Sequence, residues 1–386
     1  MVNCDFYRKI VNVLIYLYAF SIMCERIAVT YFVPVSNYIA LPLIMLICFQ
    51  LMFARKLKKT GIDIIILALW TWILIGMLWT FNLEALIIKY GLVTLLMLVA
   101  LCIIQRGLND KELRNIEIVC FIGGMLTAIT LLMEGQNFYG NMIEERLSLG
   151  RDNDPNFYAM TLLYAWAIGY QYIYEKNKIV KIIGLFGMAT LLYAIVMLGS
   201  RGGLLACIVT MIAYEIYQKH YRVLIMLLTI VGIIMTWLAG MFERFTLEVM
   251  MESGGAGRTD IWLVGWEMIK DNLFQGVGLH NFEVRYNEYA VLSETGYFRG
   301  LNRAPHNFLI EIFAELGLVG LLLYLYLYLY AIKKYVTEMV LRMHPSLING
   351  ILSTFIAALF LTTISEKIPW FLLAVIVAYG RRKENV

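Results

Sequence analysis

The sequence predicts an all-α integral membrane protein, a polytopic bundle of about twelve transmembrane helices with one large extracytoplasmic loop between the ninth and tenth spans. Three observations predict this fold class. Of the 386 residues, 61% are hydrophobic and 16% are charged, whereas a soluble protein averages about 45–50% apolar and about 25% charged residues. The apolar residues form blocks of roughly 17–25, the length of a helix that crosses about 30 Å of hydrocarbon. The basic residues gather in alternate connections between these blocks.

Twelve apolar segments are candidate transmembrane helices. They lie at roughly 10–25, 33–53, 61–80, 84–104, 114–134, 156–174, 179–198, 202–218, 222–241, 307–331, 347–363 and 368–380. Within the tenth segment, residues 324–330 alternate tyrosine and leucine as a strand would. An open strand would leave backbone groups unpaired in lipid, so we expect this stretch to be helical. Repeated glycines such as Gly202-Gly203 are expected where helices approach closely.

Short basic loops occur at every second connection, as around Arg8-Lys9, at 55–59 and at 381–383. Loops of this kind stay in the cytoplasm. We therefore expect both termini in the cytoplasm and the loops 135–155 and 242–306 on the outer side. No small-residue cleavage site follows the first apolar segment, which we interpret as a retained span.

The large loop at 242–306 is the only long polar interruption in the second half of the chain. We expect it to be part of a single membrane domain, 1–386. None of the six cysteines lies in it, which excludes a disulfide framework there, and CxxC-type metal-ligand spacing is missing. We expect no metal site, no cofactor and no nucleic acid among the partners.

The basic residues of the outer side are mostly arginines, although topology alone would favour few positive charges there. Arginine grips phosphate or carboxylate with two hydrogen bonds, so this bias predicts an anionic ligand outside the membrane. Snorkelling, or pairing with acids such as Glu144 and Glu145, is the alternative for any single arginine. Arg201 lies between two spans with almost no loop, where an ionised group is costly and marks a functional candidate. Lys89, about one turn inside its span, is a candidate by the same reasoning.

An amphipathic stretch in the large loop begins at Thr259-Asp260. Thr259 is the predicted helix N-cap, and Asp260 suits the first turn. Its tryptophans predict a helix that lies on the membrane surface. Arg258 would then sit at the positive end of this helix, where anions are favoured. An ion pair between Arg258 and Asp260 that orders the loop is the alternative.

Two of the four histidines, His280 and His306, belong to the large loop. A lone loop histidine is usually structural. The argument for His306 is that Arg201, Arg258 and His306, although distant in sequence, are all expected at one membrane face. A base that titrates near neutrality beside phosphate-binding arginines is typical of glycosyl or phosphoryl transfer.

Two other motifs are discounted. Asp152-Asn153-Asp154 has the D-x-D form of a metal and nucleotide-sugar site, but it lies on the outer side, where nucleotide sugars are not expected. Gly276-Val277-Gly278 lacks the strand–helix context of a dinucleotide site.

Several short motifs nevertheless occur together and in a fixed order. They are Asp154-Pro155-Asn156, Ser200-Arg201-Gly202-Gly203, Gly257-Arg258-Thr259-Asp260-Ile261-Trp262, Gly276-Val277-Gly278-Leu279-His280-Asn281-Phe282, Pro305-His306-Asn307-Phe308-Leu309 and Glu315-Leu316-Gly317-Leu318-Val319-Gly320. This set resembles the O-antigen ligase/polymerase family of bacterial integral membrane proteins. The similarity in topology covers nearly the whole chain, and the motifs cover mainly residues 150–320.

The resemblance implies a metal-independent glycosyltransferase of the bacterial cytoplasmic (inner) membrane. Such enzymes use sugar chains carried on undecaprenyl pyrophosphate at the outer face. The family's essential arginines and histidine correspond to Arg201, Arg258 and His306, which would be the catalytic residues. The residues expected to contact phosphate or sugar are Lys89, Arg151, Asn156, Asp260, Arg303 and Asn307. The implied partners are the undecaprenyl-pyrophosphate-linked oligosaccharide, the lipid membrane, chain-length regulators and flippases.

The shared motifs do not separate the two branches of this family. A polymerase joins repeat units of O-antigen, capsule or a related surface polysaccharide, whereas a ligase moves the finished chain to lipid A-core. We favour the polymerase, because the compact chain shows no added domain. A transporter or flippase of the same lipid-linked sugars is the rival from another class. It would need charges near the middle of several spans and, often, a repeated half, and neither is evident in the sequence.

Overall fold

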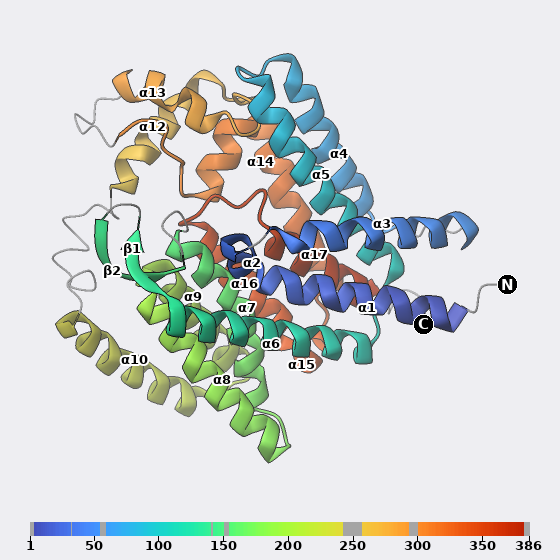
Figure 1. Ribbon diagram of the computed structural model, residues 1–386, viewed down its shortest axis with the longest axis vertical. Coiled ribbons are helices and arrows are strands. Elements are labelled where there is room, and N and C mark those ends of the chain that lie inside the picture. The colour runs from blue at the N-terminus through green and yellow to red at the C-terminus, as the bar shows by residue number, and fades with distance from the viewer. Residues whose placement is uncertain are drawn as a thin grey trace.

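The structure is a computed structural model that describes residues 4–31, 33–54, 59–139, 142–149, 154–241, 257–292 and 300–381. The candidate residue Arg151 and the parts 242–256 and 293–299 of the large loop lie outside the described residues. Helices dominate the described chain (Figure 1).

A helix occupies each of the twelve segments that were expected to span the membrane. These helices are α1 (Cys4–Met23), α3 (Val35–Ala54), α4 (Ile62–Ile75), α5 (Leu83–Arg106), α6 (Asp110–Glu134), α7 (Pro155–Ile173), α8 (Lys178–Met197), α9 (Arg201–Tyr217), α10 (Tyr221–Met241), α14 (Phe308–Tyr335), α16 (Pro345–Ala358) and α17 (Lys367–Gly380). Shorter helices join them: α2 (Glu25–Tyr31), the 3₁₀ turn η1 (Gly76–Leu78), α12 (Arg258–Asp271), α13 (Phe282–Leu292) and α15 (Glu338–Met343).

Five helices of the described residues are long and apolar enough to cross a membrane, namely 35–52 of α3 and all of α5, α6, α8 and α14. Four shorter apolar segments lie in α4 with η1, in α10, in α16 and in α17. The chain therefore has the composition and architecture of a helical membrane protein. That twelve helices span the membrane stays a prediction. The tyrosine-rich stretch at 324–330 is helical as expected, since it lies within α14.

The connection 135–155, which was expected on the outer side, contains a β-hairpin that the sequence did not predict. Strand β1 (Gln136–Tyr139) pairs antiparallel with β2 (Met142–Ser148), with Tyr139 opposite Met142 and Gln136 opposite Ser148. This hairpin is the one sheet among the described residues, so the expectation of a purely helical chain needs this correction. The hairpin packs beside α6, α7 and α8.

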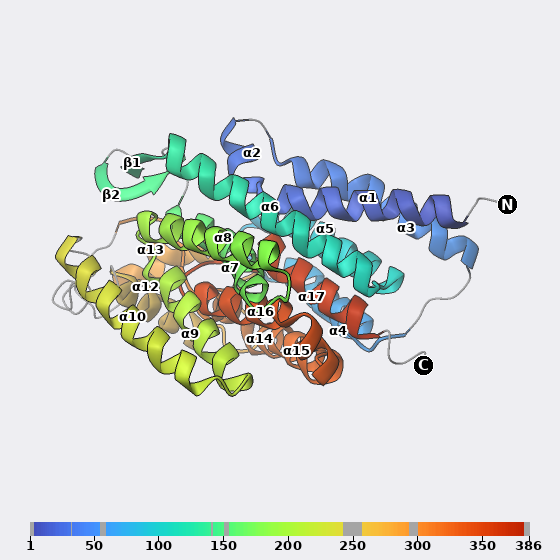
Figure 2. The same ribbon diagram turned by 90° about the horizontal axis from the view of Figure 1, so that it is seen from below.

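Contacts divide the helix ends into two groups. At one end Arg8 pairs with Glu112, Lys334 donates to the Thr60 carbonyl, and Arg381 donates to the Gln105 carbonyl. At the other end Arg26 pairs with Glu366, Lys367 pairs with Glu25, and Arg146 donates to the Leu198 carbonyl. In both views the marked chain ends lie opposite the hairpin, α12 and α13 (Figures 1 and 2). The expected alternation of connections agrees with this grouping, and which group faces the cytoplasm stays a prediction.

Helix α14 is interrupted at Gly317, whose φ of 67° is not helical. The large loop fills the interruption, because the amide of Val277 donates to the Ala314 carbonyl and the amide of Leu318 donates to the Leu273 carbonyl. Backbone that leaves the helix inside a membrane needs such protein partners. A Cβ atom on Gly276 would lie 2.6 Å from the Gly317 nitrogen, too close for any other residue. The glycines at 276 and 317 therefore dock the loop on α14.

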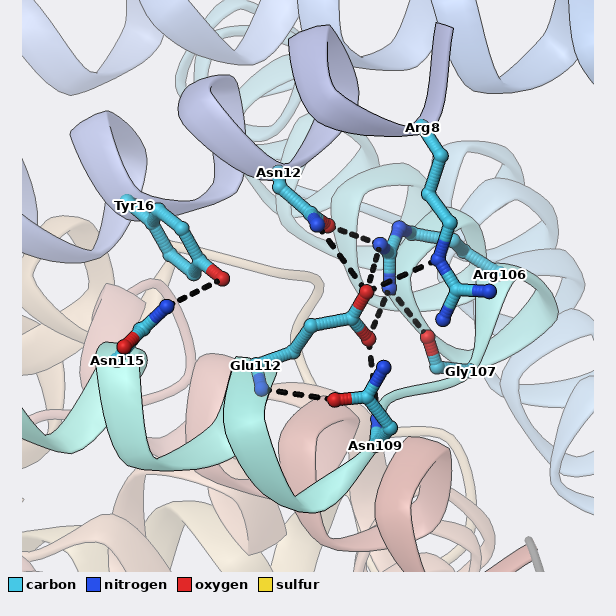
Figure 3. Close-up of polar contacts among 8 residues, drawn as sticks. All are labelled: Arg8, Asn12, Tyr16, Arg106, Gly107, Asn109, Glu112 and Asn115. Atoms are coloured by element: carbon cyan, nitrogen blue, oxygen red, sulfur yellow. Dashed lines mark hydrogen bonds and ion pairs between the residues drawn. The ribbon is translucent and has the colours of Figure 1, made fainter. Parts of the chain in front are cut away.

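Opposite this loop, a buried ion cluster joins α1, α5 and α6 (Figure 3). The Glu112 carboxylate accepts hydrogen bonds from Arg106 at 2.8 Å, from Arg8 at 3.0 Å and from Asn12 at 3.1 Å. Arg106 also donates to Asn12. Side chains of Glu112 and Arg106 are each 5% exposed. Removing one member of a buried ion pair is costly because the other charge stays buried without compensation.

We expect Glu112→Ala to destabilise the protein by about 3–5 kcal/mol, since Arg106 would be left as an uncompensated buried charge. The matched control is Glu338→Ala, which removes the acid from an ion pair with Arg342 whose side chains are both 72% exposed. The control should change stability by about 0–1 kcal/mol. Equilibrium unfolding in detergent measures both variants, and equal losses would contradict the structural role of the cluster.

Candidate active site

His306 lies in the short connection that leads into α14, with a left-handed φ of 45°. This conformation is uncommon for a residue other than glycine and needs support from its surroundings. The support comes from both sides. Trp262 Nε1 donates to the Pro305 carbonyl at 2.9 Å, and Asn307 Oδ1 accepts from the amides of Leu309 and Ile310. These contacts fix the chain on both sides of His306.

One ring nitrogen of His306 is available to accept a proton. Its Nδ1 atom is buried and has no hydrogen-bond partner among the described residues. Burial lowers the pKa of His306 below its ordinary value of 6.5, and the positive charges of Arg258 and Arg303 lower it further. The negative charge of Asp154 acts in the opposite direction without reversing the shift. His306 is therefore neutral near pH 7 and can accept a proton.

Arg258 is the first residue of α12 and is half-buried. The helix begins two residues earlier than expected, after the N-cap Gly257 in a left-handed conformation (φ 76°), so the prediction of Thr259 as N-cap was wrong. Glycine takes this conformation without strain, which lets the turn precede Arg258. The Arg258 guanidinium lies 6.0 Å from the centre of the Phe360 ring. Asp260 lies in the first turn of the helix, as predicted.

Helix α12 owes its position to a small hydrophobic core of its own. The buried residues of this core are Ile261, Val264, Met268, Ile269, Val277, Phe282, Tyr286, Tyr289 and Ala314. They come from α12, α13, the loop before α13 and the outer half of α14. The two tryptophans of α12 differ in their surroundings. Trp262 donates a hydrogen bond to the Pro305 carbonyl, whereas Trp266 is 47% exposed. The helix therefore carries Arg258 on a surface fixed to the start of α14.

Arg201 is the first residue of α9, directly after the N-cap Ser200, whose hydroxyl accepts from the Gly203 amide at 3.1 Å. A Cβ atom on Gly202 would lie 2.6 Å from Phe360 Cδ2, so the glycine allows the Phe360 ring to pack on this turn. The same ring lies beside Arg258. Phe360 therefore connects the turn of Arg201 with Arg258, two segments that are far apart in the sequence.

The hairpin contributes a residue that the sequence analysis did not assign to the site. Arg146 on β2 is 8% exposed, and its charge interacts with that of Arg201. Its Nη2 atom lies 3.9 Å from Asp154 Oδ1. Asp154 is the N-cap of α7 and accepts hydrogen bonds from the amide and the side chain of Asn156. No pattern in the local sequence marks Arg146 as a site residue, because it follows two acids with which it could simply pair. Its place beside the turn of Arg201 is visible only in the fold.

The remaining candidates differ in their surroundings. Arg303 is exposed, and its charge acts on His306. Asn307 is buried, and its Oδ1 atom caps α14. This oxygen therefore has a structural role at the start of the helix. Asn156 is buried beside Asp154. Among the described residues, no cluster of histidine, cysteine, aspartate or glutamate could hold a metal ion.

Lys89 belongs to a different set of charges. Its ammonium group interacts with Glu311 and Glu315, two buried acids of α14, and with Glu283. The Glu315 carboxylate accepts the backbone amide of His280 at 2.7 Å, which ties the large loop to α14 a second time. Burial and the charge of Lys89 lower the pKa of His280. Lys89 thus interacts with acids of α13 and α14, of which Glu315 holds the loop.

The comparison with protein families bears on these elements directly. Residues 186–325 match the family model described as O-antigen ligase. The resemblance to the O-antigen ligase/polymerase family is confirmed. The matched segment runs from α8 into α14 and includes Arg201, Arg258 and His306. No curated protein matches the chain.

Positive charge lies near a base, since the charges of Arg258 and Arg303 act on His306. Guanidinium groups from a hairpin, from the start of α9 and from the start of α12 supply positive charge and planar hydrogen-bond donors. The neutral imidazole of His306 supplies a base, because burial and the charges of Arg258 and Arg303 lower its pKa. Phosphate binding next to a base suits group transfer from a phosphorylated donor.

We expect His306 to titrate below pH 6.5 in the folded protein. The charge of Arg258 disfavours the imidazolium, so Arg258→Gln should raise the pKa of His306, whereas Asp154→Asn should lower it further. The chain has only four histidines, which makes NMR of histidine-labelled protein in detergent practical. The resonance that disappears in His306→Gln assigns the signal. Shifts of the pKa in the opposite directions would contradict the proposed surroundings of His306.

Proposed function

We propose that the protein is a glycosyltransferase that joins oligosaccharide repeat units carried on undecaprenyl pyrophosphate at the outer face of the bacterial cytoplasmic membrane. The product would be an O-antigen, a capsule or a related surface polysaccharide. The observation that carries the proposal is the Nδ1 atom of His306, which is buried and has no hydrogen-bond partner among the described residues. The charges of Arg258 and Arg303 act on the same imidazole. The family match over 186–325 supports the same class of reaction.

In the proposed reaction the acceptor hydroxyl attacks the anomeric carbon of the donor sugar. The new bond joins the acceptor oxygen to this carbon, and the bond from the carbon to the pyrophosphate oxygen breaks. The electron pair leaves with the pyrophosphate, where Arg201 and Arg258 stabilise the growing charge. The proton of the hydroxyl goes to His306. A direct attack of this kind inverts the configuration at the anomeric carbon.

A ligase that transfers the finished polysaccharide to lipid A-core is the second candidate, because the matching family model is described as O-antigen ligase. Both reactions use the same donor chemistry and the same residues. We place the polymerase first because α12 and α13, the short helices of the described segment 257–292, pack on α14 instead of forming a separate acceptor-binding domain.

Replacing the central residues should abolish long chains. We expect His306→Ala to lower the transfer rate by about 10²–10⁴, and Arg258→Lys to lower it by about 10²–10³, because a point charge does not replace a planar fork. The matched control is Arg285→Lys, since Arg285 is an outer arginine that pairs with Glu288 and stacks on Phe81. Complementation of a deletion strain, with surface polysaccharide resolved by size, measures the effect.

The same strain separates the candidates. Single repeat units on the surface acceptor in the deletion strain identify a polymerase, whereas polymer that accumulates on the lipid carrier identifies a ligase. Wild-type chains in both the His306 and the Arg258 variants would remove these residues from the mechanism and favour the transporter.

We expect transfer to continue after metal ions are removed. In the proposed mechanism, guanidinium groups neutralise the pyrophosphate, which a divalent cation does in other enzymes. Membranes that contain the protein and its lipid-linked substrate should elongate chains at an unchanged rate in EDTA. A loss of activity that added Mg²⁺ restores would contradict the assignment of this role to the arginines.

A further inference from the structure

The connection between α16 and α17, residues 359–366, contacts two of the segments that supply arginines to the candidate site. Phe360 packs on the turn that carries Arg201, because a Cβ atom on Gly202 would lie 2.6 Å from Phe360 Cδ2. The centre of the same ring lies 6.0 Å from the guanidinium carbon of Arg258. The connection lies outside the matched segment 186–325, so the family match assigns it no role.

The connection is also tied to the start of α14, the helix that follows His306. The backbone amide of Thr363 donates to the Glu311 carboxylate at 2.7 Å. Glu311 is buried and lies in the first turn of α14. A buried carboxylate and a buried amide are each costly to leave unpaired, so this bond fixes both partners. The position of the connection that carries Phe360 is therefore set relative to the helix start beside His306.

Two further contacts hold the far end of the connection. The Trp370 indole of α17 donates to the Ile364 carbonyl at 2.8 Å. The Nη2 atom of Arg26, a residue of α2, lies 2.8 Å from both carboxylate oxygens of Glu366. Three elements, α2, α14 and α17, therefore fix the connection that carries Phe360.

A fixed aromatic ring restricts an arginine that faces it. The face of the ring is negatively polarised and attracts a guanidinium within about 6 Å of its centre. An arginine side chain otherwise has many rotamers, and confining it costs conformational entropy. The ring of Phe360 cannot move toward α9, because Gly202 already lies against it. The ring is therefore a fixed surface that limits where the Arg258 guanidinium lies.

We propose that Phe360 is a positioning residue, which holds the Arg258 guanidinium beside the turn of Arg201 so that both arginines act on one pyrophosphate. This inference rests on the proposed function. Phe360 acts through Arg258 and not through the substrate. A displacement of about 1 Å costs up to about 10²-fold in rate, so an aliphatic side chain without a ring face is not an adequate replacement.

The test measures chain elongation in membranes that contain the protein and an oligosaccharide repeat unit linked to undecaprenyl pyrophosphate. Phe360→Leu keeps an apolar side chain but removes the ring face, so it should lower the rate about tenfold. Phe360→Tyr keeps the ring face and should stay within about twofold of the wild type. The matched control is Phe81→Leu, which removes a ring 4.9 Å from Arg285 and should also stay within about twofold.

A double-variant cycle separates positioning from simple packing. In Arg258→Gln no guanidinium remains to be positioned, so adding Phe360→Leu should lower the residual rate by less than about twofold. A further loss of about tenfold in this background would mean that Phe360 acts independently of Arg258, and it would overturn the inference.

A second variant leaves Phe360 in place, in case Phe360→Leu does not fold. Gly202→Ala adds a Cβ atom 2.6 Å from Phe360 Cδ2, so the ring must shift and the rate should fall about tenfold. Its control is Gly91→Ala, which should keep the wild-type rate, since a Cβ atom there meets nothing within 4 Å. A wild-type rate in Gly202→Ala or in Phe360→Leu would overturn the inference.

The outcomes separate this inference from the function on which it rests. If wild-type protein elongates chains and Phe360→Leu does so at the same rate, the inference fails alone. It also fails alone if Phe360→Tyr is as slow as Phe360→Leu, because the ring face then has no role. If wild-type protein elongates no chains, the proposed function fails and this inference fails with it.

Discussion

The site depends on a backbone contact, the docking of residues 273–278 into the interruption of α14 at Gly317. Amides of the loop take the carbonyls that the broken helix leaves open, so polar backbone can lie within a membrane helix at little cost. This contact fixes the outer half of α14 relative to α12. His306 lies just before α14, and Arg258 is the first residue of α12. A few hydrogen bonds and two glycines therefore set the distance between the base and the cation.

The electrostatics of the site follow from that constraint. Arg146, Arg201 and Arg258 come from three separate elements and are at least half-buried, with Asp154 as the acid that interacts with Arg146 and His306. Burial and the charges of Arg258 and Arg303 lower the pKa of His306 and keep it neutral, so Arg258, which would bind the leaving pyrophosphate in the proposed reaction, also prepares the base.

The helices were predictable because the length and apolarity of each segment are local properties, and a helix occupies every predicted span. Local signals were less accurate at the start of α12, where Gly257 replaces the expected cap Thr259. The role of Gly317 could not be predicted, because its contact is with Phe274, some forty residues earlier in the chain. Arg146 was missed for the same reason, since β2 shows no pattern that links it to Arg201.

The central claim is that Arg201, Arg258 and His306 form one site for a lipid-linked pyrophosphate. The most direct test is an electron cryomicroscopy structure of the protein with bound undecaprenyl pyrophosphate in a lipid nanodisc. The account predicts pyrophosphate density in contact with both arginines, and His306 Nδ1 facing the side where the sugar begins. Density that lies beside Lys89 instead, or that touches neither Arg201 nor Arg258, would contradict the account.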